Sequence, residues 1–260
     1  MGNRRWFSLR KAGPPVVVLA SLIVIWQAAV RLMGVEEYIL PSPLDIAREF
    51  VSVAPRLFEH ASATLGITLL GFAAGSAAGL LLAALLHLVP WVKAGFYPLL
   101  VLTQNVPVFV LINLFVIWFG FGMLPRLLLL MLVCFFPVAV AMLTGLTQAD
   151  PKLVNYMKMI GATKGQLFWR LELPGSISYL FSGLKIAASY SVISAIYAES
   201  TADKGLGKFI QLASNGWQTS RVFVGIVTII AISLLLFGLI TAAERMMIRW
   251  RVRSEEEAGR

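Results

Sequence analysis

The residues that commonly do acid–base or metal chemistry are scarce in this sequence. It has two histidines, His60 and His87, and neither has a second histidine at metal-ligand spacing, so we assign them no ligand role. Cys134 is the only cysteine, which excludes an intrachain disulfide and a CxxC metal motif. Between Glu59 and Asp150 no acidic residue occurs. Because proton donors and acceptors are so few, we predict neither catalytic residues nor a metal site.

The patterns of known hydrolases and nucleotide-binding proteins are also missing. An intramembrane hydrolase is the enzyme alternative, but the sequence has no HExxH, no GxSxG and no paired intramembrane aspartates. The phosphate-loop pattern GxxxxGK[ST] is absent, since the GLGK of Gly205–Lys208 lacks the upstream glycine and precedes Phe209. We therefore expect a chain that is not an enzyme and binds no cofactor. Any ATP, with its Mg²⁺, would be bound by another polypeptide.

The composition is that of a membrane protein. The 260 residues are 58% hydrophobic and 13% charged, against about 25% charged in an average soluble domain. Six apolar segments could each cross a hydrocarbon core of about 30 Å as a helix. A spanning backbone must satisfy its own hydrogen bonds, so we predict an all-α integral membrane protein with six transmembrane helices. The expected spans are 15–33, 62–88, 95–119, 127–147, 177–199 and 222–243.

Basic residues set the expected orientation. The connections on the same face of the membrane as the N-terminus hold fourteen Lys and Arg residues, and those on the other face hold seven. Lys and Arg are more frequent in cytoplasmic connections. The formal charge of +9 is explained in this way, so we expect contact with membrane lipid and no binding of nucleic acid. We predict one multi-pass domain, 1–260, in the cell (inner) membrane with both termini cytoplasmic. Its parts are tails at 1–14 and 244–260, a first helix at 15–33, a five-helix core at 62–243 and a cytoplasmic loop at 148–175.

Small and capping residues predict local packing in the second span and before it. Gly71, Gly75 and Gly79 form a ladder along which another helix can approach, either within the bundle, which we favour, or in a dimer. Ser42, with proline next and Asp45 three residues later, predicts a capped helix start. We expect a short helix on the outer surface there, with one apolar face. That face holds Ile46, Phe50, Val53 and Leu57.

Polar residues inside the spans are candidates for a translocation path. Gln104 and Asn105 interrupt the third apolar segment beside Pro107, and Ser189 and Ser194 lie within the fifth. Polar groups at membrane depth usually face the protein interior or a water-filled path. We predict that these four residues line the path. For Gln104 and Asn105 the alternative is that they only satisfy a kinked backbone.

The loop at 148–175 reads as a water-facing amphipathic helix between two spans. Gly161 and Gly165 interrupt its apolar periodicity, so we expect two short helices with a bend, the second ended by Pro174. Such an element could rest on lipid headgroups or fit a groove on another protein. The expected apolar face holds Leu153, Tyr156, Met157, Ile160, Leu167, Phe168 and Leu171, and Lys152, Lys158, Lys164 and Arg170 line the other side.

This loop resembles the cytoplasmic signature of ABC importer permeases, which runs Glu-Ala-Ala, three residues, Gly, nine residues, Ile-x-Leu-Pro. Gly161 and the ending Leu171–Pro174 match its spacing, with leucine replacing isoleucine. Asn155–Met157 stand where Glu-Ala-Ala is expected. Further blocks resemble, in the same order over residues 38 to 245, the permeases for sulfonates, nitrate, taurine and thiamine precursors. These blocks are LPSPLDI, LFVIWFGFGMLPRLLLLMLVCFFP, GATKGQLFW, FSGLKIA and DKGLGKFI.

The resemblance implies a type I ABC importer permease that forms half of a path, paired with a second permease subunit. We favour a homodimer, and a heterodimer is the alternative. The stretches WFGFG, CFFP and GLKIAASYSVISA are most similar to permeases for hydroxymethylpyrimidine-type thiamine precursors. A sulfonate, taurine, nitrate or riboflavin-type importer is the alternative. An ATP-independent channel is more distant, because it gives no reason for the cytoplasmic helix and lacks the filter sequence TVGYG.

The resemblance also implies roles for particular residues. The loop would be the coupling helix, seated in a cleft of a cytoplasmic ATPase dimer. An extracytoplasmic binding protein would deliver the solute, and Glu199, Lys204 and Trp217 are expected as its contacts or as an outer gate. Lys185, inside the fifth span, could be a gate, but we favour a side chain that extends to the cytoplasmic headgroups. The expected ATPase-docking residues are Met157, Ile160, Gly161, Ala162, Thr163, Gln166, Leu167, Phe168 and Pro174.

Overall fold

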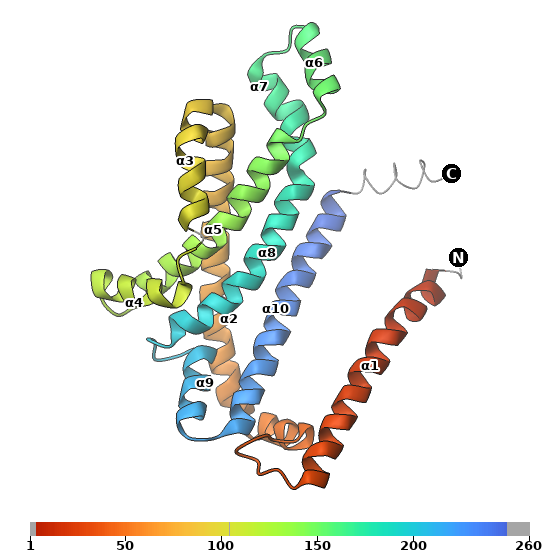
Figure 1. Cartoon of the computed structure of the whole chain (residues 1–260), viewed down its shortest axis with the longest axis vertical. Helices are drawn as coiled ribbons and strands as arrows, with labels where there is room; N and C mark the ends of the chain where they lie inside the picture. Colours follow the sequence, from red (N-terminus) through yellow and green to blue (C-terminus); the bar gives the residue numbers. More distant parts are fainter. Residues whose placement is uncertain (1–3, 104, 249–260) are drawn as a thin grey trace. The chain divides into compact units, whose positions relative to one another are not determined.

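The computed structural model describes residues 4–103 and 105–248, and within these ranges its regular secondary structure is entirely helical (Figure 1). The all-α prediction is therefore confirmed. The elements are α1 (Arg4–Met33), α2 (Pro43–Leu88), α3 (Pro90–Thr103), α4 (Val108–Phe119), α5 (Met123–Thr147), α6 (Pro151–Met159), α7 (Lys164–Leu167), a π-helix (Phe168–Glu172), α8 (Leu173–Glu199), α9 (Leu206–Asn215) and α10 (Thr219–Met247).

Five of the described helices are long and apolar enough to cross a membrane. They comprise Gly13–Met33 of α1, then α2, α5, the continuous helix Lys164–Glu199 and α10. The predicted third span, 95–119, is wrong as a single helix, because α3 and α4 are separate elements of 14 and 12 residues. Pro107 explains the break, since it lacks an N–H and disfavours helix in the residue before it. It holds an extended conformation at the start of α4, with φ −62° and ψ 126°.

The chain folds as two compact units. The smaller unit contains the N-terminal part up to Phe58 together with Phe209–Thr228. The larger unit contains Glu59–Lys208 together with the chain from Ile229 onward.

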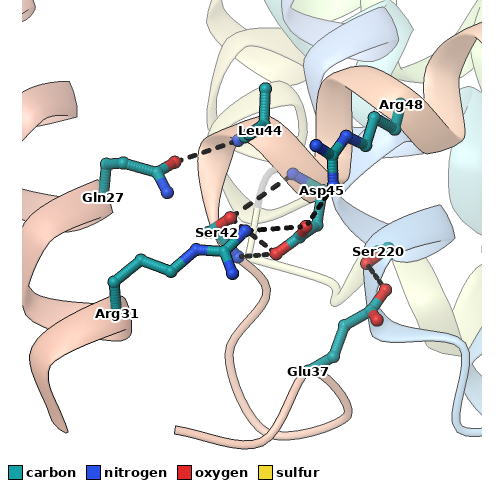
Figure 2. A network of polar contacts seen from close by, with 8 residues as sticks. All are labelled: Gln27, Arg31, Glu37, Ser42, Leu44, Asp45, Arg48 and Ser220. Carbon is teal, nitrogen blue, oxygen red and sulfur yellow. Dashed lines mark hydrogen bonds and ion pairs between the residues drawn. The ribbon is translucent and has the colours of Figure 1, made fainter. Parts of the chain in front are cut away.

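In the smaller unit, the predicted helix start at Ser42 is confirmed (Figure 2). Ser42 Oγ accepts from the Asp45 N–H at 3.4 Å, and Asp45 Oδ2 accepts from the Ser42 N–H at 3.3 Å and from the Ser42 hydroxyl at 2.5 Å. Arg31 and Arg48 lie within 4 Å of the same carboxylate. These contacts anchor the first turn of α2, as a capping residue and a nearby acid do at a helix N-terminus. The helix does not stop on the surface as predicted, because α2 continues without interruption to Leu88.

In the larger unit, the glycine ladder of α2 packs against α5. A Cβ atom on Gly71 would lie 2.3 Å from Leu130 Cβ, and one on Gly75 would lie 2.4 Å from the Met131 carbonyl oxygen. A Cβ on Gly79 would meet the Phe135 oxygen at 2.6 Å. Only glycine allows such close approach of two helices. The favoured prediction, packing within the bundle, is confirmed for this ladder.

The order of these contacts shows that α2 and α5 run in parallel, because partners advance along both helices together. Residues 89–122 must therefore return along the length of the pair, about 37 Å for the 25 residues of α5. Two separate helices, α3 and α4, lie in this segment in place of the predicted single span. Helix α8 then packs antiparallel to α5, with Gly145 against Ser176 and Gly183 against Ala141.

Candidate functional site

The loop between α5 and α8 has the predicted bend, which lies between the short helix α6 and the start of a second helix at Lys164. The Asp150 carboxylate accepts a hydrogen bond from the Lys152 N–H at 2.8 Å and caps α6. Gly161 then adopts φ +81°, in the left-handed region that favours glycine. Thr163 and Gln166 form a reciprocal capping box, with hydrogen bonds of 3.3 and 2.9 Å, that starts α7. The sequence therefore sets this bend locally.

Pro174 does not end the second helix, so that prediction is wrong. Helix α7 passes through the π-helix directly into α8, giving one continuous helix from Lys164 to Glu199. Pro174 lacks an N–H, and the wider π turn before it accommodates the missing i→i−4 bond, with the Leu173 N–H bonded to the Phe168 carbonyl. The part of the loop from Lys164 onward is thereby a helical extension of α8.

The predicted docking residues divide by exposure. Ile160, Gly161, Thr163 and Gln166 are exposed, and Met157, Ala162 and Pro174 are half-buried. Leu167 and Phe168 are 9% and 5% exposed, so in this structure they do not form part of an exposed docking face.

Phe168 instead lies in a core cluster with Ala83 and Leu86 of α2 and Leu143 and Leu146 of α5. Sequence reasoning missed two strongly exposed apolar side chains of the loop, Met159 at 79% and Trp169 at 68%. Both lie one position away from residues that the apolar periodicity selected.

The three predicted path residues that the structure describes, Asn105, Ser189 and Ser194, do not share one surface. Gln104 lies outside the described residues. Asn105 is exposed and its Nδ2 is 3.5 Å from the Leu102 carbonyl oxygen, as expected if it satisfies a kinked backbone. Ser189 is half-buried, and its hydroxyl donates to the Lys185 carbonyl oxygen. Ser194 is 3% exposed and therefore buried within the bundle.

A cavity of about 510 Å³ is lined by residues of α4, α5 and α8 and by Val106. Its lining contains no charged side chain. Tyr190 contributes the one phenol, and Phe136 and Pro137 belong to the same wall. The lining residues are Val106, Val108, Leu111, Leu132, Val133, Phe136, Pro137, Val140, Ala141, Ile186 and Tyr190.

At the other end of α8, Glu199 is buried in a polar cluster. Its side chain is 1% exposed, and Oε2 accepts hydrogen bonds from Thr64 Oγ1 and the Gly207 N–H, both at 2.9 Å. Gly205 adopts φ +131°, and a Cβ there would lie 2.2 Å from Glu199 Cδ. Glu199 therefore fastens the segment after α8 to α2. In this conformation its carboxylate is not presented to a partner.

The other two predicted outer residues lie at the surface. Lys204 pairs with Glu59, whose carboxylate raises the pKa of the lysine ammonium. Trp217, in the smaller unit, is 76% exposed and holds a positive φ of 56°, an uncommon conformation for a bulky residue. These two residues remain predicted contacts for a binding protein.

Lys185 has a partner on α10. Its ammonium donates to Glu244 Oε2 at 2.5 Å and lies 5.8 Å from the Phe237 ring centre. Both charged side chains are less than one quarter exposed. Pairing satisfies the charge of the lysine, and Glu244 is the first residue of the predicted cytoplasmic tail. The extension of Lys185 to the cytoplasmic headgroups stays a prediction.

Comparison with known proteins gives consistent family matches. Residues 75–249 match the family described as "Binding-protein-dependent transport system inner membrane component". The chain is 34% identical over 239 residues to the formylaminopyrimidine transport permease protein ThiX of Halalkalibacterium halodurans, covering 91% of this chain and 95% of the relative. It is 31% identical over 237 residues to the riboflavin transport system permease protein RibX of Chloroflexus aurantiacus, covering 90% and 88%.

The fold is similar to that of a solved amino acid ABC transporter. The TM-score is 0.64 at 17% sequence identity, covering 76% of this chain and 97% of that chain. Together with the apolar helices and the family match over two thirds of the sequence, these similarities identify a multi-pass membrane permease of the type I importer fold. The chain belongs to the family of binding-protein-dependent transport system inner membrane components, the permease subunits of ABC importers.

Proposed function

We propose that this permease imports a small planar heteroaromatic solute, with a thiamine-precursor pyrimidine as the best candidate. A binding protein would deliver the solute from outside, and a cytoplasmic ATPase dimer would drive the cycle with ATP and Mg²⁺. The observation that carries the ATP-driven part of the proposal is the exposed surface of the loop at 148–175, whose second half is a helical extension of α8. In this proposal both termini and the loop are cytoplasmic.

The surface of the loop fits a protein partner better than lipid. Met159, Ile160 and Trp169 are exposed apolar residues, while Lys158 and Lys164 are exposed charges on the same short segment. Exposed apolar anchors surrounded by polar groups are typical of helix-in-groove docking. Gly161 leaves the bend free of side-chain bulk, since nothing lies within 4 Å of the place a Cβ would occupy. A partner surface can therefore approach the backbone closely at this point.

The proposed solute class is supported by the cavity beside α8 and by the relatives. A sulfonate or nitrate needs cationic or strong hydrogen-bonding partners when it leaves water, and the cavity lining has no charged side chain. A flat, uncharged ring can instead contact the Tyr190 and Phe136 aromatic groups. The transported compounds in the names of two relatives, formylaminopyrimidine and riboflavin, both contain such rings.

A second copy of the chain would complete the path. Ile186, Tyr190, Ile193 and Tyr197 follow one face of α8 at helical spacing, and each is about half exposed. Tyrosine side chains facing hydrocarbon at membrane depth leave a hydroxyl without water. We therefore place this face of α8 toward the path between two permease subunits.

The test is uptake by cells that carry or lack this chain. Labelled formylaminopyrimidine should enter cells that have the chain, and excess unlabelled taurine should not compete. The Tyr190→Ala variant should lower uptake, whereas Ile226→Ala, a change at an exposed position on α10, should not. Chain-dependent uptake of taurine or a sulfonate instead of the pyrimidine would contradict the solute class. Uptake that continues after ATP depletion would favour a channel.

A further inference from the structure

The C-terminal end of α2 is tied to the coupling loop by a polar pair. His87 Nε2 lies 2.7 Å from Glu172 Oε2, and the two side chains are 16% and 12% exposed. An ionised carboxylate can only accept, so the His87 Nε2–H donates in this bond. His87 is the next-to-last residue of α2, and Glu172 ends the π-helix that joins α7 to α8. The pair therefore connects two elements that are 85 residues apart in the sequence.

Aromatic and apolar contacts surround the pair. The His87 and Phe168 ring centres are 6.0 Å apart, and Phe168 lies in the core cluster with Ala83 and Leu86 of α2. Partial burial strengthens a hydrogen bond and makes an unpaired partner costly. The contact between the loop and α2 thus has one directional bond within a packed apolar shell.

The two sides of the pair would respond differently to movement of the loop. Helix α8 is continuous with α7, so a displacement at α7 reaches α8 through the backbone. Helix α2 has no such connection to the loop. It is packed against α5 through the glycine ladder, so whatever moves the end of α2 also acts on α5.

We propose that His87 and Glu172 are positioning residues that make α2 move together with the coupling loop during the ATP-driven cycle. The inference rests on the proposed function, in which a partner ATPase moves the loop. The pair transmits movement of the helix that begins at Lys164 to the end of α2. Without it, that movement would reach α2 only through the apolar contacts around Phe168 and through α5.

Distance measurements between spin labels test the link directly. Labels are attached to cysteines introduced at Leu88 and Lys158, both exposed, and the native Cys134 is fully buried and stays unlabelled. The complex purified with its ATPase is measured without nucleotide and with ATP plus vanadate. In the otherwise unchanged chain we expect the same narrow distance distribution in both states, because α2 follows the loop.

Variants identify the pair as the cause. Glu172→Ala, His87→Ala and the double variant should each give an ATP-dependent change of that distance, and the double variant should add nothing to the singles. The exchange His87→Glu/Glu172→His should restore the constant distance. Arg170→Gln, a change on the exposed side of the same π-helix, is the matched control and should leave the distance constant. These comparisons separate a link from a contact that only stabilises the fold.

The results that overturn the inference differ from those that overturn the proposed function. An ATP-dependent distance change in the unchanged chain, or a constant distance in Glu172→Ala, rules out the pair as the link. If no ATPase purifies with the unchanged chain, the proposed function fails. The link is then judged on the chain alone, where Glu172→Ala must broaden the distribution relative to Arg170→Gln. An equal width in those two variants rejects it.

Discussion

The Thr64 hydroxyl and the Glu199 carboxylate form a buried hydrogen bond of 2.9 Å that fastens the end of α8 to α2. Thr64 Oγ1 also accepts a bond from the Leu206 N–H at 2.8 Å, and both side chains are 0–1% exposed. Thr64 therefore serves two buried groups at once. Removing the Thr64 hydroxyl therefore tests both of these buried hydrogen bonds at once.

Replacing that hydroxyl by a methyl group should destabilise the protein. Thr64→Val keeps the shape of the side chain but leaves the Leu206 N–H unpaired and removes one bond from Glu199. Leaving buried polar groups unsatisfied costs about 1–3 kcal/mol. The measurement is thermal unfolding in mild detergent, where Thr64→Val should unfold at a clearly lower temperature. Thr241→Val is the control, because the Thr241 hydroxyl is exposed and bonds only the Phe237 carbonyl of its own helix. Equal unfolding temperatures for the two variants would show that the Thr64–Glu199 contact does not stabilise the junction of α8 and α2.

The glycine ladder gives a prediction with an internal control. Gly75→Ala would place a Cβ 2.4 Å from the Met131 carbonyl oxygen, so α2 and α5 must move apart. Overpacking of this kind typically costs about 1–3 kcal/mol. Gly66→Ala lies on the same helix with nothing within 4 Å, and should be neutral or stabilising by about 1 kcal/mol because alanine favours helix. The unfolding temperature of Gly75→Ala should therefore fall, and that of Gly66→Ala should stay the same or rise. A Gly75→Ala variant as stable as Gly66→Ala would show that the two helices do not pack through this ladder.

Gly161 should be more important for coupling than for insertion. Arginine at its φ of +81° is strained by about 1–2 kcal/mol, and its side chain would extend into the bend that we assign to ATPase docking. Gly161→Arg should insert at normal levels while transport is lost or uncoupled from ATP hydrolysis. Gly165→Arg changes another exposed glycine of the loop, which has no positive φ, and tests whether added bulk alone is enough. Uptake and membrane levels are measured together, and normal uptake by Gly161→Arg would remove the assigned role of the bend.

The pair between Lys185 and Glu244 should show strong coupling between mutations. Lys185→Met alone leaves the partly buried Glu244 carboxylate without its cationic partner. Glu244→Gln alone leaves the partly buried Lys185 ammonium without its anionic partner. Loss of one member should lower stability by about 1–2 kcal/mol, less than for a fully buried pair because water reaches both groups. The double variant should be closer to the unchanged protein than either single variant. Additive losses in a double-mutant cycle, measured by unfolding, would mean that the pair contributes no interaction of its own.

Features that depend on neighbours in the sequence were predictable. The cap formed by Ser42 and Asp45 uses residues three apart, and the bend at Gly161 follows from local turn chemistry. The glycine ladder was assigned correctly because its spacing by itself makes a groove. The family of the permease could be recognised from ordered sequence blocks.

Features that join distant segments were not predictable. The partners of Lys185, His87 and Thr64 are 59, 85 and 135 residues away along the chain. No periodicity reveals which helix faces which, so the Glu244 partner of Lys185 was not predicted and Phe168 was expected at a partner surface. The break between α3 and α4 was also missed as a helix boundary, although Pro107 provided the local signal. Residues 95–119 were predicted as one helix because they are mostly apolar, although proline lacks the N–H that a helix interior requires.

The central claim is that the loop at 148–175 docks a cytoplasmic ATPase, and co-purification tests it most directly. The tagged chain is extracted from its native membrane in mild detergent, and the proteins that elute with it are identified and quantified. We predict an ATPase with a phosphate loop in stoichiometric amount, lost in Gly161→Arg while the variant itself remains folded. A chain that elutes without any ATPase, under conditions that keep other membrane complexes intact, would contradict the claim and place the loop on the lipid surface.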